Sequence, residues 1–184
     1  MERIAVTNRH LCEGDFFEQI QRIAQGGYYQ TLILREKDLS EQEYKYYAQQ
    51  VMEICRKNQI RCILHSFYPV AKELGCRNLH MPLPALERMS QRDRDFFDEI
   101  GASVHSVEQV RRAMQCGASY LVAGHIFETG CKPGLPPRGL DFLREVLCEV
   151  TIPVYGIGGI TPQNEKAVME CGASGVCVMS GCMT

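Results

Sequence analysis

The sequence lacks the segments that would identify a membrane protein, a secreted protein or a nucleic-acid-binding protein. No apolar run approaches the ~20 residues of a membrane-spanning helix, and the opening "MERIAVTNRH" has no long apolar stretch of a signal peptide. The 20 Lys and Arg residues are scattered, and the formal net charge is only -2, which argues against nucleic acid as a partner. We therefore expect a soluble, cytoplasmic protein whose ligand is a small molecule.

The ten cysteines also lack the spacing of a zinc or redox site, because no C-x-x-C pair occurs. Many lie in apolar segments such as "GVCVMSG" at 175–181, which is typical of small buried residues in a reducing compartment. Cys131 differs because it lies in a polar loop beside Lys132, a neighbour that could lower the pKa of its thiol. No dedicated base accompanies it, so its role stays open.

Length and composition favour one folded unit. The chain has 184 residues, of which 45% are hydrophobic and 23% charged, close to the average of globular proteins. Two independent cores would each be small at this length. We expect a single domain over residues 1–184.

Short apolar segments alternate with helical patterns along the chain. The apolar segments are typical of strands buried on both faces, and they cover residues 3–8, 31–35, 61–65, 78–82, 101–105, 120–125, 153–159 and 175–181. Helix starts are indicated by capping spacings at Ser40 with Glu43 and Ser106 with Gln109, and by Thr161-Pro162. Helix ends are indicated by Gly75, Gly117 and Gly172.

The segments "CGASYLVAG" (116–124) and "CGASGVCVMSG" (171–181) repeat one helix-turn-strand unit. Eight such strands predict an α/β fold, a (β/α)8 TIM barrel, with the open doubly wound sheet as the alternative. Only Cys182, Met183 and Thr184 follow the last glycine, so the last helix is expected to be truncated or missing. We expect a second copy to cover that side, which makes the protein a homo-oligomer.

Polar residues gather where the predicted strands end, and that end carries the active site of a (β/α)8 barrel. They are Arg35, His65, His80, His105, His125, the 156–159 turn and Ser180. His65 and His80 are also explained as core-edge histidines bonded to backbone, and His105 as a residue that orients the Ser106 turn. A metal site lacks support because there is no H-x-H pair and no Asp after the eighth strand.

His125 is the strongest catalytic candidate, because it begins the Gly- and Pro-rich loop "GHIFETGCKPGLPPRGL" (124–140) and imidazole exchanges protons near neutral pH. The glycines of "YGIGGITPQN" (155–164) and "MSG" (179–181) predict a phosphate site, since amides of small residues after the last two strands can surround an anion. The alternative is a tight turn alone.

Together these motifs resemble the TenI family of thiazole tautomerases, within the thiamine phosphate synthase superfamily. The resemblance covers most of the chain, and its most specific segments are "SVHS" (103–106) and "GHIFETGCK" (124–132). Synthases of that superfamily carry an Asn-Asp-Arg after strand three and an Asp after strand four, which bind magnesium and a pyrimidine pyrophosphate. Here those places read "HSF" (65–67) and "MPLPAL" (81–86), without a carboxylate.

The resemblance therefore implies a cofactor-independent isomerase of thiamin biosynthesis that aromatises a carboxythiazole phosphate by a 1,3 proton shift. His125 would be the acid/base and His105 a second proton carrier or carboxylate contact. Arg35 and Lys132 would bind the substrate carboxylate, and Gly158, Gly159, Ser180 and Gly181 the phosphate. The alternatives are a thiamine phosphate synthase, which couples thiazole phosphate to pyrimidine pyrophosphate, and a non-catalytic ligand-binding regulator.

Overall fold

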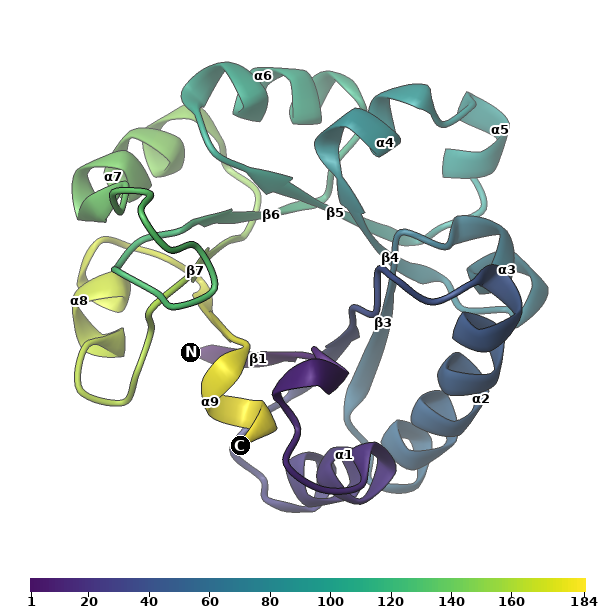
Figure 1. Cartoon of the computed structure of the whole chain (residues 1–184). Helices are drawn as coiled ribbons and strands as arrows, with labels where there is room; N and C mark the ends of the chain where they lie inside the picture. Colours follow the sequence, from purple (N-terminus) through teal and green to yellow (C-terminus); the bar gives the residue numbers. More distant parts are fainter.

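Eight parallel strands close into a barrel in the computed structural model, which describes residues 1–184 (Figure 1). Each strand pairs with the next in the chain, and the last pairs with the first, so the open sheet is wrong and the barrel prediction is confirmed. The strands are β1 (Glu2–Val6), β2 (Thr31–Leu34), β3 (Arg61–His65), β4 (Asn78–Pro82), β5 (Glu99–Val104), β6 (Tyr120–Gly124), β7 (Val154–Ile157) and β8 (Gly175–Val178).

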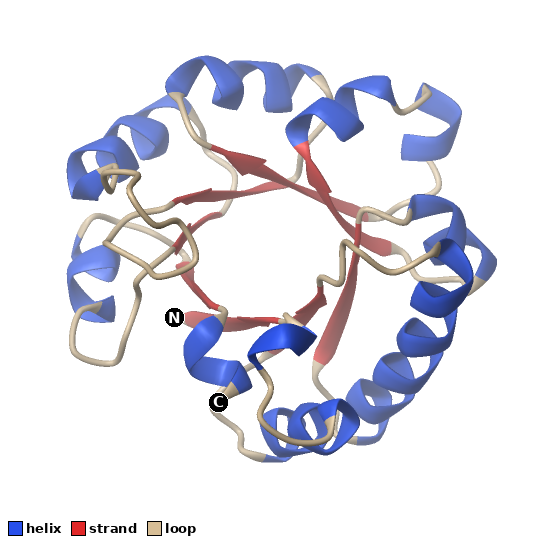
Figure 2. Ribbon diagram, in the orientation of Figure 1, coloured by secondary structure: helices blue, strands red, loops and turns tan.

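Helices surround the strands on the outside, and the ring they form is visible when the barrel is viewed end on (Figures 1 and 2). The α-helices are α1 (Phe16–Gln25), α2 (Glu41–Lys57), α3 (Tyr68–Glu73), α4 (Leu83–Arg88), α5 (Gln91–Arg94), α6 (Val107–Gln115), α7 (Gly139–Glu149), α8 (Glu165–Glu170) and α9 (Ser180–Met183). A short 3-10 helix, η1 (Arg9–Leu11), follows β1.

Alternation along the strands divides the core into two clusters. In β1, Ile4 and Val6 belong to a cluster of 8 buried residues inside the barrel, whereas Ala5 belongs to a cluster of 38 between the strands and the helices. Because side chains of a strand point alternately to its two faces, the parity of a residue decides whether it faces the interior. The same rule carries into the residues that follow each strand.

The helix signals of the sequence are confirmed in part. Ser40 and Glu43 form a full capping box at α2, while the Ser106 hydroxyl accepts only from the Gln109 amide. The prediction that Thr161-Pro162 begins a helix is wrong, because α8 starts at Glu165. Thr161 instead donates its amide to Asn164 Oδ1, which closes a turn before the helix. The predicted helix ends are confirmed, since Gly75, Gly117 and Gly172 all have positive φ.

The truncated last helix is confirmed as the single turn α9, which lies over the barrel end beside α1 in Figure 1. Its Cys182 and Met183 are buried, and the Gln19 side chain of α1 donates to the Cys182 carbonyl at 2.8 Å. A cavity of about 410 Å³ remains between α1, α8 and α9. The second copy that we expect at this side stays a prediction. None of the helices is both long and apolar enough to cross a membrane.

A polar network fills the opposite end of the barrel. Glu2 accepts hydrogen bonds from Thr31, Tyr155 and Arg61, and Arg61 also pairs with Glu99 at 2.9 Å. Burial would raise the pKa of the Glu2 carboxyl, but these hydrogen bonds and the Arg61 charge hold it below its ordinary value. This end is therefore filled by satisfied side chains, which leaves the carboxyl end of the strands for a ligand.

All ten cysteines are free thiols, four of them buried. Cys148 is exposed together with Cys131, so Cys131 is not the single exception that the sequence suggested.

Candidate functional site

Several polar side chains at the carboxyl end of the barrel point into its interior, because side chains alternate along each strand. Ile33 and Ile63 face the interior, so Arg35 and His65, two residues further along, lie on the same inner side. His80 belongs to this set too, because its neighbours Leu79 and Met81 pack outward. The sequence prediction that these side chains share one end is thus supported by strand geometry.

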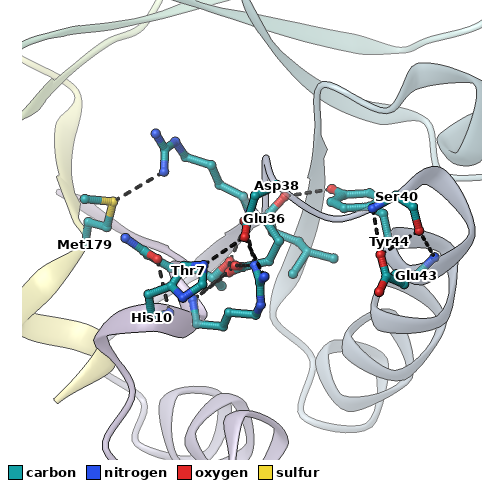
Figure 3. A network of polar contacts seen from close by, with 12 residues as sticks. Thr7, His10, Glu36, Asp38, Ser40, Glu43, Tyr44 and Met179 are labelled. Atoms are coloured by element: carbon teal, nitrogen blue, oxygen red, sulfur yellow. Dashed lines mark hydrogen bonds and ion pairs between the residues drawn. The ribbon is translucent and has the colours of Figure 1, made fainter.

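Arg35 reaches across the mouth, and its acidic neighbour points away from it. The Arg35 guanidinium lies 3.8 Å from Met179 Sδ, which follows β8. Glu36, only 2% exposed, accepts from the Thr7 hydroxyl at 2.7 Å and from the amide and guanidinium of Arg9. Figure 3 shows Thr7, Glu36 and Asp38 together between Met179 and α2. The Glu36 carboxylate is thereby occupied by protein donors.

Four cations face this mouth, Arg35, Lys37, Lys132 and Arg138, and none makes an ion pair. We call them the mouth cations. Desolvation, and then the charges of Arg35 and Lys132, lower the pKa of Lys37. Desolvation and the charges of Arg138 and Arg35 likewise lower the pKa of Lys132. Mutual repulsion of this kind is relieved when an anion binds among the cations.

His65 and His80 form a neutral pair below the mouth cations. Their rings stack with centroids 5.5 Å apart, and each residue is only 3% exposed. Burial, followed by the charges of Arg35 and Lys37, lowers the pKa of His80 to about 3, and burial with the His80 charge lowers that of His65 well below its ordinary value. Both imidazoles are therefore uncharged at neutral pH.

The expected backbone partners of these two histidines are wrong, because side chains bind them. His80 Nδ1 lies 3.0 Å from the Tyr120 hydroxyl and Nε2 lies 2.8 Å from Ser103 Oγ. His65 Nδ1 lies 2.7 Å from Ser66 Oγ. A neutral imidazole has one donor and one acceptor nitrogen, and the contacts of His80 with Tyr120 and Ser103 hold the Ser103 oxygen in place at the mouth.

His105 is held by the neighbouring strand. Its Nδ1 lies 2.6 Å from the carbonyl oxygen of Gly124, and a carbonyl can only accept, so Nδ1 carries the proton. Desolvation lowers the pKa of His105, the Gly124 bond opposes this, and the charges of Lys132 and Arg138 lower it further. The neutral ring therefore keeps Nε2 as an acceptor. The residue also orients its turn as expected, because its amide donates to Gln109 Oε1 at 2.7 Å.

His125 lies beneath the loop that follows β6. It is 5% exposed, and its Nε2 donates to the Leu135 carbonyl at 3.3 Å. Its Nδ1 is buried and has no hydrogen-bond partner. Such an atom is costly to leave unpaired, so Nδ1 is a candidate atom for a hydrogen bond with a ligand. The loop returns to the same residue, since the Arg138 amide donates to the His125 carbonyl at 3.0 Å.

The two glycine-rich loops differ from the predicted helix-start phosphate site. Gly158 and Gly159 have φ of +99° and +65°, but they lie in a turn several residues before α8. An added Cβ on Gly158 would lie 2.3 Å from His125 Cβ, and one on Gly159 would lie 2.2 Å from the Glu128 carbonyl oxygen. These glycines therefore allow the loop after β6 to pack against the loop after β7.

The same loops still present backbone donors. The amides of Gly158, Gly159 and Ile160 and that of Met179 donate to no acceptor in the protein. Ser180 and Gly181 lie beside Met179 and are exposed. A group of free amides after the last two strands can bind an anion, although neither α8 nor α9 is long enough to contribute much as a helix dipole.

These side chains do not suit a magnesium ion. Mg²⁺ requires oxygen ligands, usually one or two carboxylates, and no group of three or more His, Cys, Asp or Glu residues converges anywhere in the protein. Glu36 is bound by protein donors, and Asp38 pairs with Arg9 and His10. The loops after β3 and β4 contain no free acid facing the mouth, so the chain's own residues do not fit the cation.

The structure brings together most of the predicted site residues. His105, His125, Arg35 and Lys132 surround the mouth, with the glycine loops at one side. Sequence reasoning missed Lys37, Ser103, Met179 and Arg138. Parity could have identified Ser103 and Met179, because each lies two residues beyond an inward-facing position of its strand. Arg138 had no such signal, because its position depends on the path by which the loop after β6 returns to the barrel.

Comparisons with known proteins identify the family of this chain. The profile of the family described as "Thiamine monophosphate synthase" matches residues 4–182. The thiamine-phosphate synthase of Clostridium acetobutylicum is 32% identical over 97% of this chain and 85% of its own length. A putative thiamine-phosphate synthase 2 of Aquifex aeolicus is 30% identical over 96% of this chain and 94% of its own.

Solved structures agree on the fold. The thiamine phosphate pyrophosphorylase from Pyrococcus furiosus superposes with a TM-score of 0.84 and 25% identity, and the match covers 100% of this chain and 88% of that one. A 3-hexulose-6-phosphate synthase, at 11% identity and a TM-score of 0.67, shares the fold alone.

These relatives correct the activity that the sequence suggested. Full-length relatives at about 30% identity carry the name thiamine-phosphate synthase, so the prediction of an isomerase that acts as a thiazole tautomerase is wrong. That prediction rested on two short segments, residues 103–106 and 124–132, and on the absence of metal-binding carboxylates. Similarity that extends over 97% of the chain favours the alternative of a coupling enzyme.

Proposed function

Since the chain belongs to the thiamine monophosphate synthase family, we propose that it is a transferase of thiamin biosynthesis. It joins a thiazole phosphate to a pyrimidine pyrophosphate and releases thiamine phosphate and pyrophosphate. The observation that carries this proposal is the convergence of four unpaired cations on one barrel mouth. Both substrates are anions, and both would be attracted to that mouth.

The mouth cations are the proposed pyrophosphate site. Arg35 offers a planar fork of donors that matches two phosphate oxygens, and Lys37 and Lys132 supply point charges. The lowered pKa values of Lys37 and Lys132 support this role, because repulsion among the cations in the free enzyme is relieved when the anion binds. Binding energy of this kind would hold the leaving group where charge develops on it.

The glycine loops are the proposed site of the thiazole phosphate. Gly158, Gly159, Ser180 and Gly181 border the free amides described above, and the Ser180 hydroxyl adds a donor. The two anionic groups would then lie on different sides of the mouth. That separation would leave the reacting carbon and nitrogen to meet between them.

His125 and His105 take a different role from the proton transfer first expected. The coupling forms a bond from the thiazole nitrogen to the pyrimidine-bearing carbon and has no net proton transfer. Each histidine has a ring nitrogen that faces no protein partner, Nδ1 of His125 and Nε2 of His105, because the other ring nitrogen contacts a carbonyl. We assign both as hydrogen-bonding residues that orient a substrate. No resident cofactor is part of this proposal.

The test is a coupling assay with the purified chain, thiazole phosphate and pyrimidine pyrophosphate, in which thiamine phosphate is measured by chromatography. We expect product, and we expect Lys132→Met to lower kcat/KM by about 10-fold or more, the order of a lost charge-assisted contact. Lys166→Met is the matched control, since that side chain is 85% exposed on α8. Absence of product under all conditions, or a Lys132→Met variant as active as wild type, would refute the proposal.

A further inference from the structure

The acidic residues near the mouth are few, and most are occupied. Glu36 is buried and accepts from Thr7 and Arg9. Asp38 is bound at 2.6 Å by both Arg9 guanidinium nitrogens. Glu128 is exposed on the loop after β6, and its carboxylate makes no hydrogen bond or ion pair with the protein. One free carboxylate among four cations is a poor seat for a small hard cation that needs several oxygen ligands.

The cations, in contrast, have no acidic partner, and Arg138 alone lies over an aromatic ring, 5.6 Å from the centroid of Phe142. Of the four, only Arg35 has a side-chain contact of the hydrogen-bonding kind, and that is the weak one with Met179 Sδ at 3.8 Å. Lys132 and Arg138 belong to the loop after β6. Two backbone hydrogen bonds anchor this loop at the barrel: the Arg138 amide donates to the His125 carbonyl, and the Phe127 amide donates to the Gly158 carbonyl. Charges from two separate loops therefore converge on one space.

From this donor set we propose that the coupling reaction of this chain needs no divalent cation, because Arg35, Lys37, Lys132 and Arg138 neutralise the departing pyrophosphate directly. The inference rests on the proposed function. Where a metal-dependent enzyme bridges phosphate oxygens with a cation, this mouth presents guanidinium and ammonium groups that would act on the same oxygens.

The step balances without any further reactant. The bond between carbon and the pyrophosphate oxygen breaks, and its electron pair leaves with pyrophosphate. The lone pair of the thiazole nitrogen forms the new carbon–nitrogen bond. No proton, hydride or electron is exchanged with the protein. What the protein must supply is compensation for the negative charge that grows on the leaving oxygen, and the mouth cations provide it.

The direct test compares coupling in buffer with excess EDTA and in buffer with increasing Mg²⁺. We expect the initial rate in EDTA to lie within about 2-fold of the best rate in Mg²⁺, since no protein ligand set is completed by the ion. A product that forms only with Mg²⁺, or a saturable stimulation of 10-fold or more, would overturn the inference while leaving the proposed function intact.

A second measurement does not depend on turnover. Calorimetric titration of the full chain with inorganic pyrophosphate in EDTA should show binding, and Mg²⁺ should weaken it, because magnesium pyrophosphate carries less charge for the cations to bind. Lys37→Met should weaken the binding in EDTA by about 10-fold, and Lys166→Met should leave it unchanged. Pyrophosphate that binds only with Mg²⁺, or equally well to Lys37→Met, contradicts the inference.

The two experiments separate the two ideas. If no thiamine phosphate forms in either buffer, the proposed function fails, and the titration still decides whether the mouth binds pyrophosphate without a metal. If product forms only with Mg²⁺, the function holds and the inference fails. Product in EDTA together with tight pyrophosphate binding in EDTA supports both.

Discussion

His80 makes the stability of this protein sensitive to mild acid. The folded structure lowers its pKa from the ordinary 6.5 to about 3, first through burial and then through the charges of Arg35 and Lys37. The unfolded chain has no such environment and binds the proton near pH 6.5. Stability is therefore fully present above about pH 6.5 and is lost as the pH falls toward about 3, because the unfolded state takes up the proton first.

The size of the effect follows from the two pKa values. At pH 7 the proton is mostly absent from both states, so the contribution is small. At pH 5 the unfolded chain carries it almost completely and the folded protein almost never. Linkage then lowers the free energy of unfolding by about 2 kcal/mol between pH 7 and pH 5 from this one residue. His65 shifts in the same direction and adds to the total.

The assay is urea unfolding, followed by far-ultraviolet circular dichroism, at pH 7 and at pH 5. His80→Gln removes the titrating group and keeps an amide that can bond Tyr120 and Ser103. We expect the variant to be less stable than wild type at pH 7, because the geometry of two buried hydrogen bonds is disturbed.

The decisive quantity is the loss of stability between the two pH values, which should be about 2 kcal/mol smaller in His80→Gln than in wild type. Comparing differences removes the contributions of the other titrating groups that both proteins share. An equal loss in both proteins would refute the reasoning, since His80 would then have the same pKa folded and unfolded.

Three further substitutions test the parts of the fold that position the mouth. Tyr44→Phe should lower the free energy of unfolding by about 2–3 kcal/mol in the same urea assay, because its buried hydroxyl bonds one strand carbonyl and one strand amide, and a loss below 0.5 kcal/mol would count against this. Gly158→Ala should cost about 2–4 kcal/mol through positive φ and a clash with His125, whereas Gly130→Ala, with open space around it, should be nearly neutral. Ser40→Ala should cost about 1 kcal/mol through loss of the α2 cap, measured as a lower Tm.

Much of the scaffold could be predicted because it depends on local rules. Short apolar segments that alternate with helical patterns located all eight strands to within a few residues. The pairing of each strand with its neighbour follows from the repeated strand-helix unit. Gly117 and Gly172 ended helices because only a residue tolerant of positive φ fits there. The Thr161-Pro162 signal located a turn instead, in which Thr161 donates its amide to Asn164 Oδ1, and α8 begins only at Glu165.

Only those site residues could be predicted that lie at the ends of strands and point into the barrel. His65, His80 and Arg35 were found because they lie in or directly after predicted strands. The protonation states of the two histidines depend on burial that no sequence pattern reveals. The side-chain partners of His80 come from β5 and β6, and such contacts depend on the register in which the three strands pair. The activity was predicted wrongly because short motifs show which chemical groups are present. The reaction also depends on how the whole site holds its substrates.

The neutral histidines and the mouth cations are coupled, and that coupling has a consequence for ligand binding. Arg35 and Lys37 are among the causes that lower the pKa of both His65 and His80. An anion bound between those cations would offset their charge, so the histidine pKa values would rise on binding, although burial would still keep them below 6.5. By reciprocity, binding of a phosphate-bearing ligand would take up protons as the pH approaches the pKa of His80, about 3, and would recover part of the stability lost in acid. The complex should therefore lose less stability in acid than the free protein, although burial leaves both of them acid-sensitive.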